Sequence, residues 1–213
     1  MASMPEVKIY LKNPPGYAII GTGKSPGLFQ MAFLIFLLHQ SGGTMIIRSA
    51  TTADAVRLLE IYSWYVENTA ITYEYVTPSL TEFENRIHST LERFPYLVLE
   101  EDHVIQGYAY AGSFQSRAAY SHCCELSIYL DHNAKGHGYG RKLYEALEDE
   151  LGKMGFINLY ACIGDPVTED EYLTHNSEQF HQHMGFTKIG TFHRCGRKFN
   201  RWYNMIYMEK IIG

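Results

Sequence analysis

The feature that most constrains the fold is a glycine-rich turn between an apolar strand and a long helix. Residues 126–130 (LSIYL) are typical of a buried strand, and Gly136, Gly138 and Gly140 follow. Residues 140–153 then carry apolar side chains at helical spacing. Glycines lack Cβ, so successive backbone N–H groups can converge on one anion, and a helix N-terminus adds partial positive charge. The pattern predicts a pyrophosphate-binding turn, although an ordinary turn explains three alternating glycines equally well.

Charged side chains around the turn fit the same interpretation. Lys135 and Arg141 flank the glycines, and His137 lies between them. A dinucleotide site would instead need G-x-G-x-x-G after the first strand and an acidic residue about 20 residues further on. Here the turn follows several strands that look antiparallel, and the glycine spacing differs. The sequence therefore favours a phosphate-bearing cofactor other than NAD.

The order of elements from Met45 onward predicts a mixed α/β domain. Apolar runs predict strands at 46–48, 96–100, 104–112, 125–130, 159–163, 187–192 and 202–209. Helices are expected from a cap at Thr51 or Thr52 to Val66, from a capping box at Thr81 and Glu84, and over 140–153 and 177–184. The basic segment 193–201 is expected to be a loop. This order gives a mixed sheet with helices on its faces.

Composition supports a folded domain and argues against other classes of function. The 213-residue chain is 46% hydrophobic and 19% charged, which is enough apolar mass for a core. Its net charge of −5 argues against a broad nucleic-acid-binding face, even though residues 193–201 are basic. Cys123, Cys124, Cys162 and Cys195 show no zinc-ligand spacing. We expect buried free thiols, no metal and a cytoplasmic location.

The first 44 residues differ from the rest and are expected to be a leader outside the domain. They are rich in proline and glycine, and their apolar run, 28–38, is about half the length that spans a bilayer. Residues 18–25 (AIIGTGKS) come close to a P-loop, but Pro26 and Gly27 weaken the helix that such a loop must open. We expect no membrane span and no nucleotide site here. A packed extra element or an interfacial anchor remains an alternative.

Several stretches together resemble the GCN5-related N-acetyltransferases (the GNAT superfamily). Lys135-x-x-Gly138-x-Gly140 resembles their acetyl-CoA motif, with lysine in place of the usual Gln or Arg. The resemblance runs from Met45 to about Lys210. Within the superfamily it is strongest to the phosphinothricin and methionine sulfoximine acetyltransferases, in residues 72–74 (TYE), 117–120 (RAAY), 125–129 (ELSIY), 177–186 (SEQFHQHMGF) and 198–202 (KFNRW).

This resemblance implies the GNAT fold, with about seven strands in a splayed mixed sheet and about four flanking helices. Strand 125–130 would part from strand 159–163, and the pantetheine arm of acetyl-CoA would enter the gap like a missing strand. Thr174 stands where the subgroup often has an asparagine, with Asn176 close by. The implied cofactor contacts are Ile128, Tyr129, Leu130, Lys135, Gly136, His137, Gly138, Tyr139, Gly140, Arg141, Asn176 and Ser177.

The resemblance also assigns the chemistry. An ammonium has no lone pair, so acetylation needs a general base near the amine, and Glu125 occupies the position of a catalytic glutamate. His181 stands where many members have a tyrosine general acid that protonates the departing thiolate. The expected substrate residues either bind a carboxylate or phosphinate or form the pocket wall. They are Tyr73, Glu74, Arg117, Tyr120, Lys198 and Arg201. For each of these, ordinary packing or surface pairing is the alternative.

The resulting hypothesis is an acetyl-CoA-dependent N-acetyltransferase that acts on a small anionic amine. The amine would be an amino acid or a glutamate analogue such as phosphinothricin or methionine sulfoximine, acetylated by direct transfer in a homodimer. Two alternatives stay open: acetylation of protein termini or lysines, and a non-catalytic acyl-CoA-binding module. No nucleic-acid partner is expected.

Overall fold

The computed structural model describes residues 11–13, 16–18, 44–134 and 136–213. The chain divides into two units, Met1–Gly43 and Thr44–Gly213. In the first unit, β1 (Leu11–Asn13) pairs antiparallel with β2 (Gly16–Ala18). The apolar run 28–38 and nearly all of the P-loop-like segment 18–25 lie outside the described residues. In the part of the chain that is described, no helix is both long and apolar enough to cross a bilayer.

The second unit is built on one seven-stranded mixed sheet, which confirms the predicted fold class. Its strand order is β3-β4-β5-β6-β7-β9-β8, with β6 and β7 parallel and the other neighbours antiparallel. The strands are β3 (Met45–Ser49), β4 (Tyr96–Glu101), β5 (Val104–Ser113), β6 (Cys123–Leu130), β7 (Asn158–Asp165), β8 (Thr187–Lys198) and β9 (Arg201–Ile211).

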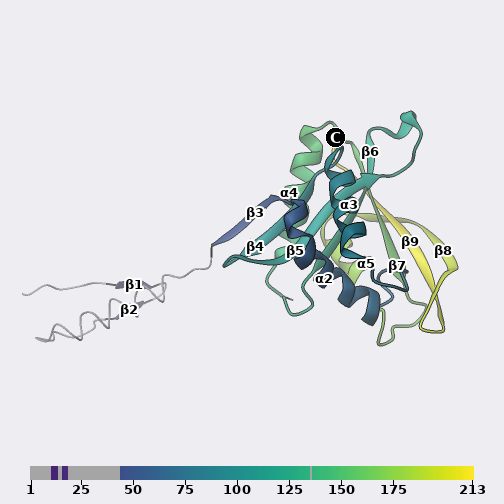
Figure 1. The fold of residues 1–213 in the computed structure, drawn as a ribbon, viewed down its shortest axis with the longest axis horizontal. Coiled ribbons are helices and arrows are strands. Elements are labelled where there is room, and N and C mark those ends of the chain that lie inside the picture. Colours follow the sequence, from purple (N-terminus) through teal and green to yellow (C-terminus); the bar gives the residue numbers. More distant parts are fainter. Residues whose placement is uncertain (1–10, 14–15, 19–43, 135) are drawn as a thin grey trace, which may run out of the picture. The chain divides into compact units, whose positions relative to one another are not determined.

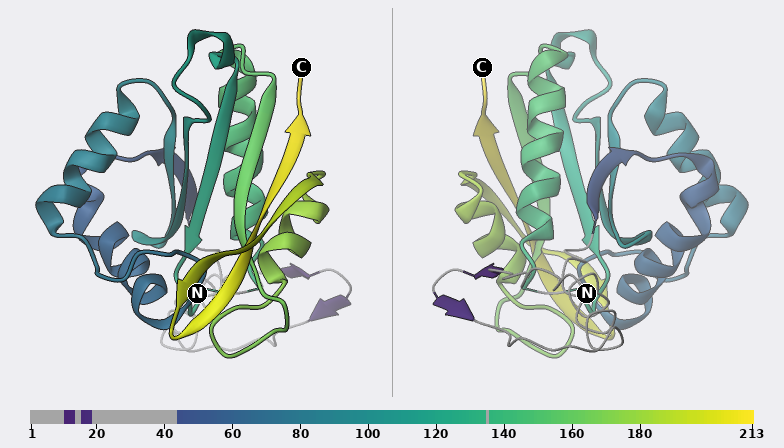
Figure 2. Two further views of the ribbon diagram at one scale, coloured as in Figure 1. Left: turned by 90° about the vertical axis from the view of Figure 1, so that its right-hand side faces the viewer. Right: turned by 90° about the vertical axis from the view of Figure 1, so that its left-hand side faces the viewer.

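Helices cover both faces of this sheet, as the predicted order requires. They are α2 (Ala55–Asn68), α3 (Leu80–Leu91), α4 (Tyr139–Lys153) and α5 (Asn176–His183). Figures 1 and 2 show α2 and α3 on one face and α4 on the other. Leu143 and Leu147 of α4 are buried in one core cluster, whereas Leu58 of α2 and Ile87 of α3 are buried in a second. The sheet thus separates two apolar layers, and the parallel pair β6–β7 lies between them.

The start of α3 differs from the prediction. The N-cap is Ser79, whose side chain accepts a hydrogen bond from the Glu82 backbone N–H at 3.2 Å. The expected capping box at Thr81 and Glu84 is therefore wrong, because Thr81 already lies inside the helix. Ser79 has the extended backbone that an N-cap requires, and sequence spacing alone does not reveal this.

The basic segment 193–201 is mostly strand, contrary to the expected loop. Strand β8 continues to Lys198, and a two-residue turn at Phe199 and Asn200 leads into β9. Both turn residues have positive φ, 49° and 60°, as the twisted hairpin turns of antiparallel sheets require. The pairing register shifts between Phe192 and Gly196, and this irregularity interrupts the alternation by which a strand is recognised.

The connection between α2 and α3, residues 69–79, is fastened to the β8–β9 hairpin. The Tyr73 ring packs on Gly196, and its hydroxyl donates to the Asn204 carbonyl at 2.8 Å. The buried Lys198 ammonium donates to the Thr72 carbonyl, also at 2.8 Å. Ile71 from the same connection lines the cleft described below. The hairpin therefore helps to set the position of one wall of that cleft.

We predict that Gly196→Ala destabilises the protein by about 1–3 kcal/mol, the usual cost of overpacking. A Cβ at this position would overlap the Tyr73 ring, whose Cε1 atom would be 2.9 Å away. Urea unfolding followed by circular dichroism measures the change. Gly190→Ala is the matched control on the same strand, because a Cβ there meets no atom within 4 Å. Equal stability of the two variants would contradict the packing of Tyr73 on Gly196.

Candidate active site

The central feature of the site is the point where β6 and β7 part. The two strands pair only over Cys123–Leu126 and Asn158–Ala161, while β6 continues to Leu130 and β7 to Asp165. The predicted splay is therefore present in the structure. A cleft of about 60 Å³ opens there, lined by Ile71, Leu126, Ser127, Ile128, Tyr129, Tyr144, Ala161, Cys162, Ile163, Gly164, Ser177 and His181. The edge of β6 that faces this cleft has unpaired backbone groups that an extended ligand can bind.

The glycine turn leads from β6 into α4 and has the local geometry of an anion site. Gly136 and Gly138 have φ of 82° and 75°, a conformation that favours glycine, and Gly138 is the N-cap of α4. The first backbone N–H groups of a helix have no acceptor within it, so this end of α4 is electropositive. Gly140 packs under the Phe180 ring, where a Cβ would lie 3.1 Å from Cε2. Lys135 lies outside the described residues.

Other predicted cofactor residues have partners within the protein. The buried Tyr139 donates its hydroxyl to the Glu101 carboxylate and stacks on His137 with ring centroids 5.1 Å apart, so it supports the turn. The exposed Arg141 lies 3.7 Å from Glu145. In the same region, the Leu130 carbonyl accepts the Tyr65 hydroxyl at 2.7 Å. Asn176 begins α5, and its backbone N–H donates to Thr174 Oγ1 at 3.4 Å.

Glu125 lies on β6 just before the strands part. Its Oε2 accepts a hydrogen bond from the Tyr207 hydroxyl at 3.2 Å. Desolvation raises the pKa of Glu125, and the hydrogen bond from Tyr207 lowers it in part. The register partner of Glu125 on β5 is Gly112, where a Cβ would meet no atom within 4 Å. The carboxyl group is thus partly shielded from water but has space beside it.

His181 is buried in the cleft wall, 3% exposed, with both ring nitrogens engaged. Nδ1 lies 2.7 Å from the Ser177 carbonyl and Nε2 lies 2.8 Å from the Tyr144 hydroxyl. A carbonyl can only accept, so Nδ1 carries the proton and Nε2 accepts from Tyr144. Desolvation lowers the pKa of His181. Proton donation from Nε2 would require the imidazolium form, which burial disfavours, so the expected general-acid role stays a prediction.

We predict that His181 stays neutral, with its proton on Nδ1, at pH 7. Burial lowers the pKa of His181, so as the pH falls the unfolded chain binds a second imidazole proton before the folded protein does. The contribution of neutral His181 to stability is therefore lost as the pH falls below about 6.5. Nitrogen NMR of histidine-labelled protein reports the tautomer, and His183, exposed on the same helix, is the internal reference. A doubly protonated His181 at pH 7 would contradict this geometry.

Most of the predicted substrate residues are held by protein groups. The Arg201 guanidinium binds Glu171 at 2.7 and 2.8 Å and lies 2.9 Å from Asp170. Glu74 accepts from Arg86 at 2.8 Å. As described above, Tyr73 and Lys198 bind backbone carbonyls. These contacts within the protein account for the positions of the four side chains.

Arg117 and Tyr120 belong to the connection between β5 and β6, around the turn η2 (Ala118–Tyr120). Among the described residues, Arg117 has no ion-pair partner. The half-exposed Tyr120 ring meets Phe114 edge-on at 6.0 Å, and Phe114 stacks on Tyr160 at 4.1 Å. Of the cationic side chains predicted to bind substrate, Arg117 is therefore the one that no other described residue binds.

Sequence reasoning missed Tyr207, Gly112 and Tyr144. Tyr207 shares its face of β9 with Tyr203, whereas Ile206 and Met208 lie on the other face, in the core cluster that α4 covers. This alternation was available as a signal that Tyr207 lies on the face opposite the α4 core. The hydrogen bond to Glu125, however, joins residues 82 positions apart and left no local pattern.

A cluster of Asp165, His175 and Glu178 has ligand atoms within 4.8 Å of one another. Each group already has a protein partner. Asp165 accepts from Asn204 at 3.3 Å and lies 3.4 Å from His175, and Glu178 accepts from Lys188 at 3.3 Å. Polar contacts within the protein, including the Lys188–Glu178 ion pair, account for the cluster.

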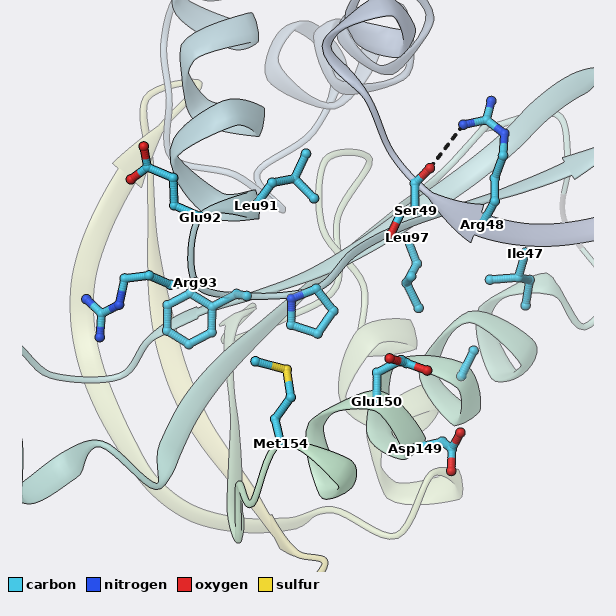
Figure 3. Close-up of a pocket in the computed structure, with 13 residues that line it drawn as sticks. Ile47, Arg48, Ser49, Leu91, Glu92, Arg93, Leu97, Asp149, Glu150 and Met154 are labelled. Atoms are coloured by element: carbon cyan, nitrogen blue, oxygen red, sulfur yellow. Dashed lines mark hydrogen bonds between the residues drawn. The ribbon is translucent and has the colours of Figure 1, made fainter.

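A larger cavity, 590 Å³, shares no lining residue with the cleft. Figure 3 shows it between the end of α3, β3 and α4, with Arg48, Asp149 and Glu150 at its margin. Arg48 pairs with Asp54 at 2.8 Å, and the two acidic residues pair with Lys153 at 2.6 and 3.2 Å. The charges of Arg48, Asp149 and Glu150 are thus compensated by the protein. The cavity also lacks the combination of open strand edge, nearby helix N-terminus and shielded carboxyl that occurs where β6 and β7 part.

The cysteines are free, but only half of them are buried. Cys123 and Cys124 are buried, as expected, whereas Cys162 and Cys195 are exposed, contrary to expectation. The reason is alternation, because Cys162 lies between the buried residues Ala161 and Ile163 and points to the other face of β7.

Comparison with known proteins agrees with this geometry. Residues 47–207 match the model of the acetyltransferase (GNAT) domain, so the chain belongs to the GNAT acetyltransferase family, as the sequence predicts. It is 34% identical to an L-amino acid N-acyltransferase of Escherichia coli over 78% of this chain and 92% of the relative.

Two solved structures are similar to the second unit. One is a phosphinothricin acetyltransferase of Sinorhizobium meliloti in complex with acetyl-CoA, with a TM-score of 0.73 and 33% identity over 80% of this chain and 89% of that one. The other is a ribosomal-protein-alanine N-acetyltransferase of Brucella melitensis, with a TM-score of 0.71 and 33% identity over 78% and 99% of the two chains.

Proposed function

We propose that the protein transfers the acetyl group of acetyl-CoA directly to the amine of a small anionic substrate, with Glu125 as general base. The observation that carries the proposal is the position of Glu125, a shielded carboxyl beside the point where β6 leaves β7. The substrate class is an amino acid or a glutamate analogue such as phosphinothricin or methionine sulfoximine. The similar E. coli and S. meliloti enzymes support this choice.

The residues of the cleft and turn fit acetyl-CoA. The co-substrate supplies an activated acetyl thioester. The unpaired edge of β6 at Ile128 and Leu130 would bind the pantetheine arm, and the N-terminus of α4 with Gly136 and Gly138 would bind the pyrophosphate. A backbone N–H of β6 would stabilise the oxyanion that develops on the thioester carbonyl.

Glu125 is suited to take a proton from the ammonium form of the substrate. Burial raises its pKa toward the working pH, which makes it a better-matched base than an exposed carboxylate. The amine would lie in the space beside Gly112, opposite Glu125. Arg117 would bind the substrate's carboxylate or phosphinate.

Acetylation of protein termini or lysines is the second candidate, supported by the similarity to the ribosomal-protein-alanine N-acetyltransferase of Brucella melitensis. A homodimer and a cytoplasmic location are part of the proposal as well. Exposed apolar side chains on the β8–β9 hairpin support the dimer, namely Ile189, Phe192 and Trp202 at 50%, 52% and 55% exposure. Strand β8 is also an edge of the sheet, which a second copy can cover.

We predict thiol release from acetyl-CoA in the presence of phosphinothricin, methionine sulfone or a common amino acid. Turnover with peptides alone would favour the second candidate. Acetyl-CoA binding with no amine-dependent turnover would show a binding module, and failure to bind acetyl-CoA would refute the proposal.

Glu125→Gln should lower kcat/KM at neutral pH by about 10²–10⁴-fold, the usual contribution of a general base. The loss should shrink at high pH, where the amine is neutral without help. The acidic limb set by the raised pKa of the Glu125 carboxyl should be replaced by a rise at higher pH, where the substrate amine loses its proton unaided. Glu92→Gln, an exposed carboxyl at the end of α3, is the control and should behave as wild type. An unchanged profile in Glu125→Gln would remove Glu125 from the mechanism.

A further inference from the structure

Tyr207 reaches Glu125 across an intervening strand. It lies on β9, and the sheet order places β7 between β9 and β6. Its register partner on β7 is Cys162, whereas that of Glu125 is Tyr160. The hydroxyl nevertheless donates to Glu125 Oε2 at 3.2 Å. A side chain from the end of the chain is thus bound to the proposed base.

The position of this hydroxyl is set by aromatic packing. The Phe192 ring meets the Tyr207 ring at 5.9 Å and 69°, and the Phe114 ring meets it at 6.2 Å and 86°. Phe114 is itself stacked on Tyr160 at 4.1 Å. Such edge-to-face contacts favour one ring orientation. The donor therefore approaches the carboxyl from a direction determined by residues of three segments.

Four titratable groups lie close enough to Glu125 to interact with its charge, and they are neutral over the working pH range. They are Tyr110 from β5, Tyr144 from α4, Cys162 from β7 and Tyr207, which alone among them is hydrogen-bonded to Glu125. Desolvation by neighbouring protein groups raises the pKa of each phenol, and it raises the pKa of the Cys162 thiol, which lines the cleft, to about 11. Tyr207 consequently remains a hydrogen-bond donor, and the carboxyl is the group of this set that changes charge between weakly acidic and neutral pH.

We propose that Tyr207 is a positioning residue for Glu125: its hydroxyl binds Oε2 and leaves Oε1 to receive the proton of the acceptor amine. This inference rests on the proposed function. In the step concerned, an N–H bond of the ammonium breaks and an O–H bond forms at Oε1. The products are a neutral amine and a neutral carboxyl group, while Tyr207 keeps its own proton.

The test is the pH profile of kcat/KM for Tyr207→Phe, which keeps the ring and removes the donor. Without the hydrogen bond the carboxylate is less stable, so the acidic limb should move to higher pH. At the acidic side of the profile, kcat/KM should fall roughly tenfold, since a hydrogen bond to a charged group is lost. The KM for acetyl-CoA should stay unchanged, because Tyr207 lies outside the cleft lining and the glycine turn.

Tyr160→Phe is the matched control. Tyr160 is the register partner of Glu125 and stacks on Phe114, but its hydroxyl contacts Asn158 at 3.4 Å and makes no hydrogen bond to Glu125. Its acidic limb should remain at the wild-type position. An equal shift in both variants would overturn the inference, since the effect would then come from general loss of hydroxyl groups.

Glu125→Gln separates this inference from the proposed function. If its acidic limb stays at the wild-type position, the base assignment fails and the role of Tyr207 fails with it. If that limb moves to the higher pH at which the amine is neutral, while the limb of Tyr207→Phe stays at the wild-type position, only the inference on Tyr207 is overturned. Carbon NMR of the Glu125 carboxyl gives a second readout without turnover, and should show titration at higher pH in Tyr207→Phe than in wild type. Unchanged titration would also overturn the inference.

Discussion

The separation of β6 from β7 after Leu126 is the constraint on which the rest of the site depends. Backbone N–H and C=O groups in a sheet normally pair with the next strand, and unpaired ones carry a free-energy cost when buried. Here that cost is avoided only because the edge faces a cleft instead of the core. Tyr144 and His181 form the helical wall of the cleft and are hydrogen-bonded to each other. Specific side-chain contacts therefore stabilise the gap between the strands.

Two chemical environments result on the two sides of this parting. Toward α4 lie a helix N-terminus and two glycines in the left-handed region, which suit an anion. Toward the opposite face lies Glu125, partly desolvated and bound by one phenol. If the proposed function holds, anionic acetyl-CoA and a cationic amine would approach from different directions and meet where the strands diverge. The fold would then bring the two reactants together while the groups that attract them stay apart.

The sequence predicted the parts of this arrangement that are local. The strand–glycine–helix segment around Gly138 and the order of strands and helices follow from periodicity and backbone preference, and family resemblance placed Glu125 at the parting. The misses are of two kinds. Ser79 and the turn at Phe199 depend on backbone angles that residue type does not uniquely specify. The bonds of Lys198 to the 69–79 connection and of Tyr207 to Glu125 join distant positions, so no window of sequence contains them.

The packing of Tyr73 on Gly196 has a consequence for how related chains diverge. A bulkier residue at position 196 fits only if position 73 becomes smaller, and the reverse substitution would leave a hole. The two positions are therefore expected to change together during evolution. Because Ile71 lies on the same connection as Tyr73, we expect sequence changes in the hairpin to alter the width of the cleft as well. Variation at the rim of the sheet would then change the cleft while the residues proposed to be catalytic stay the same.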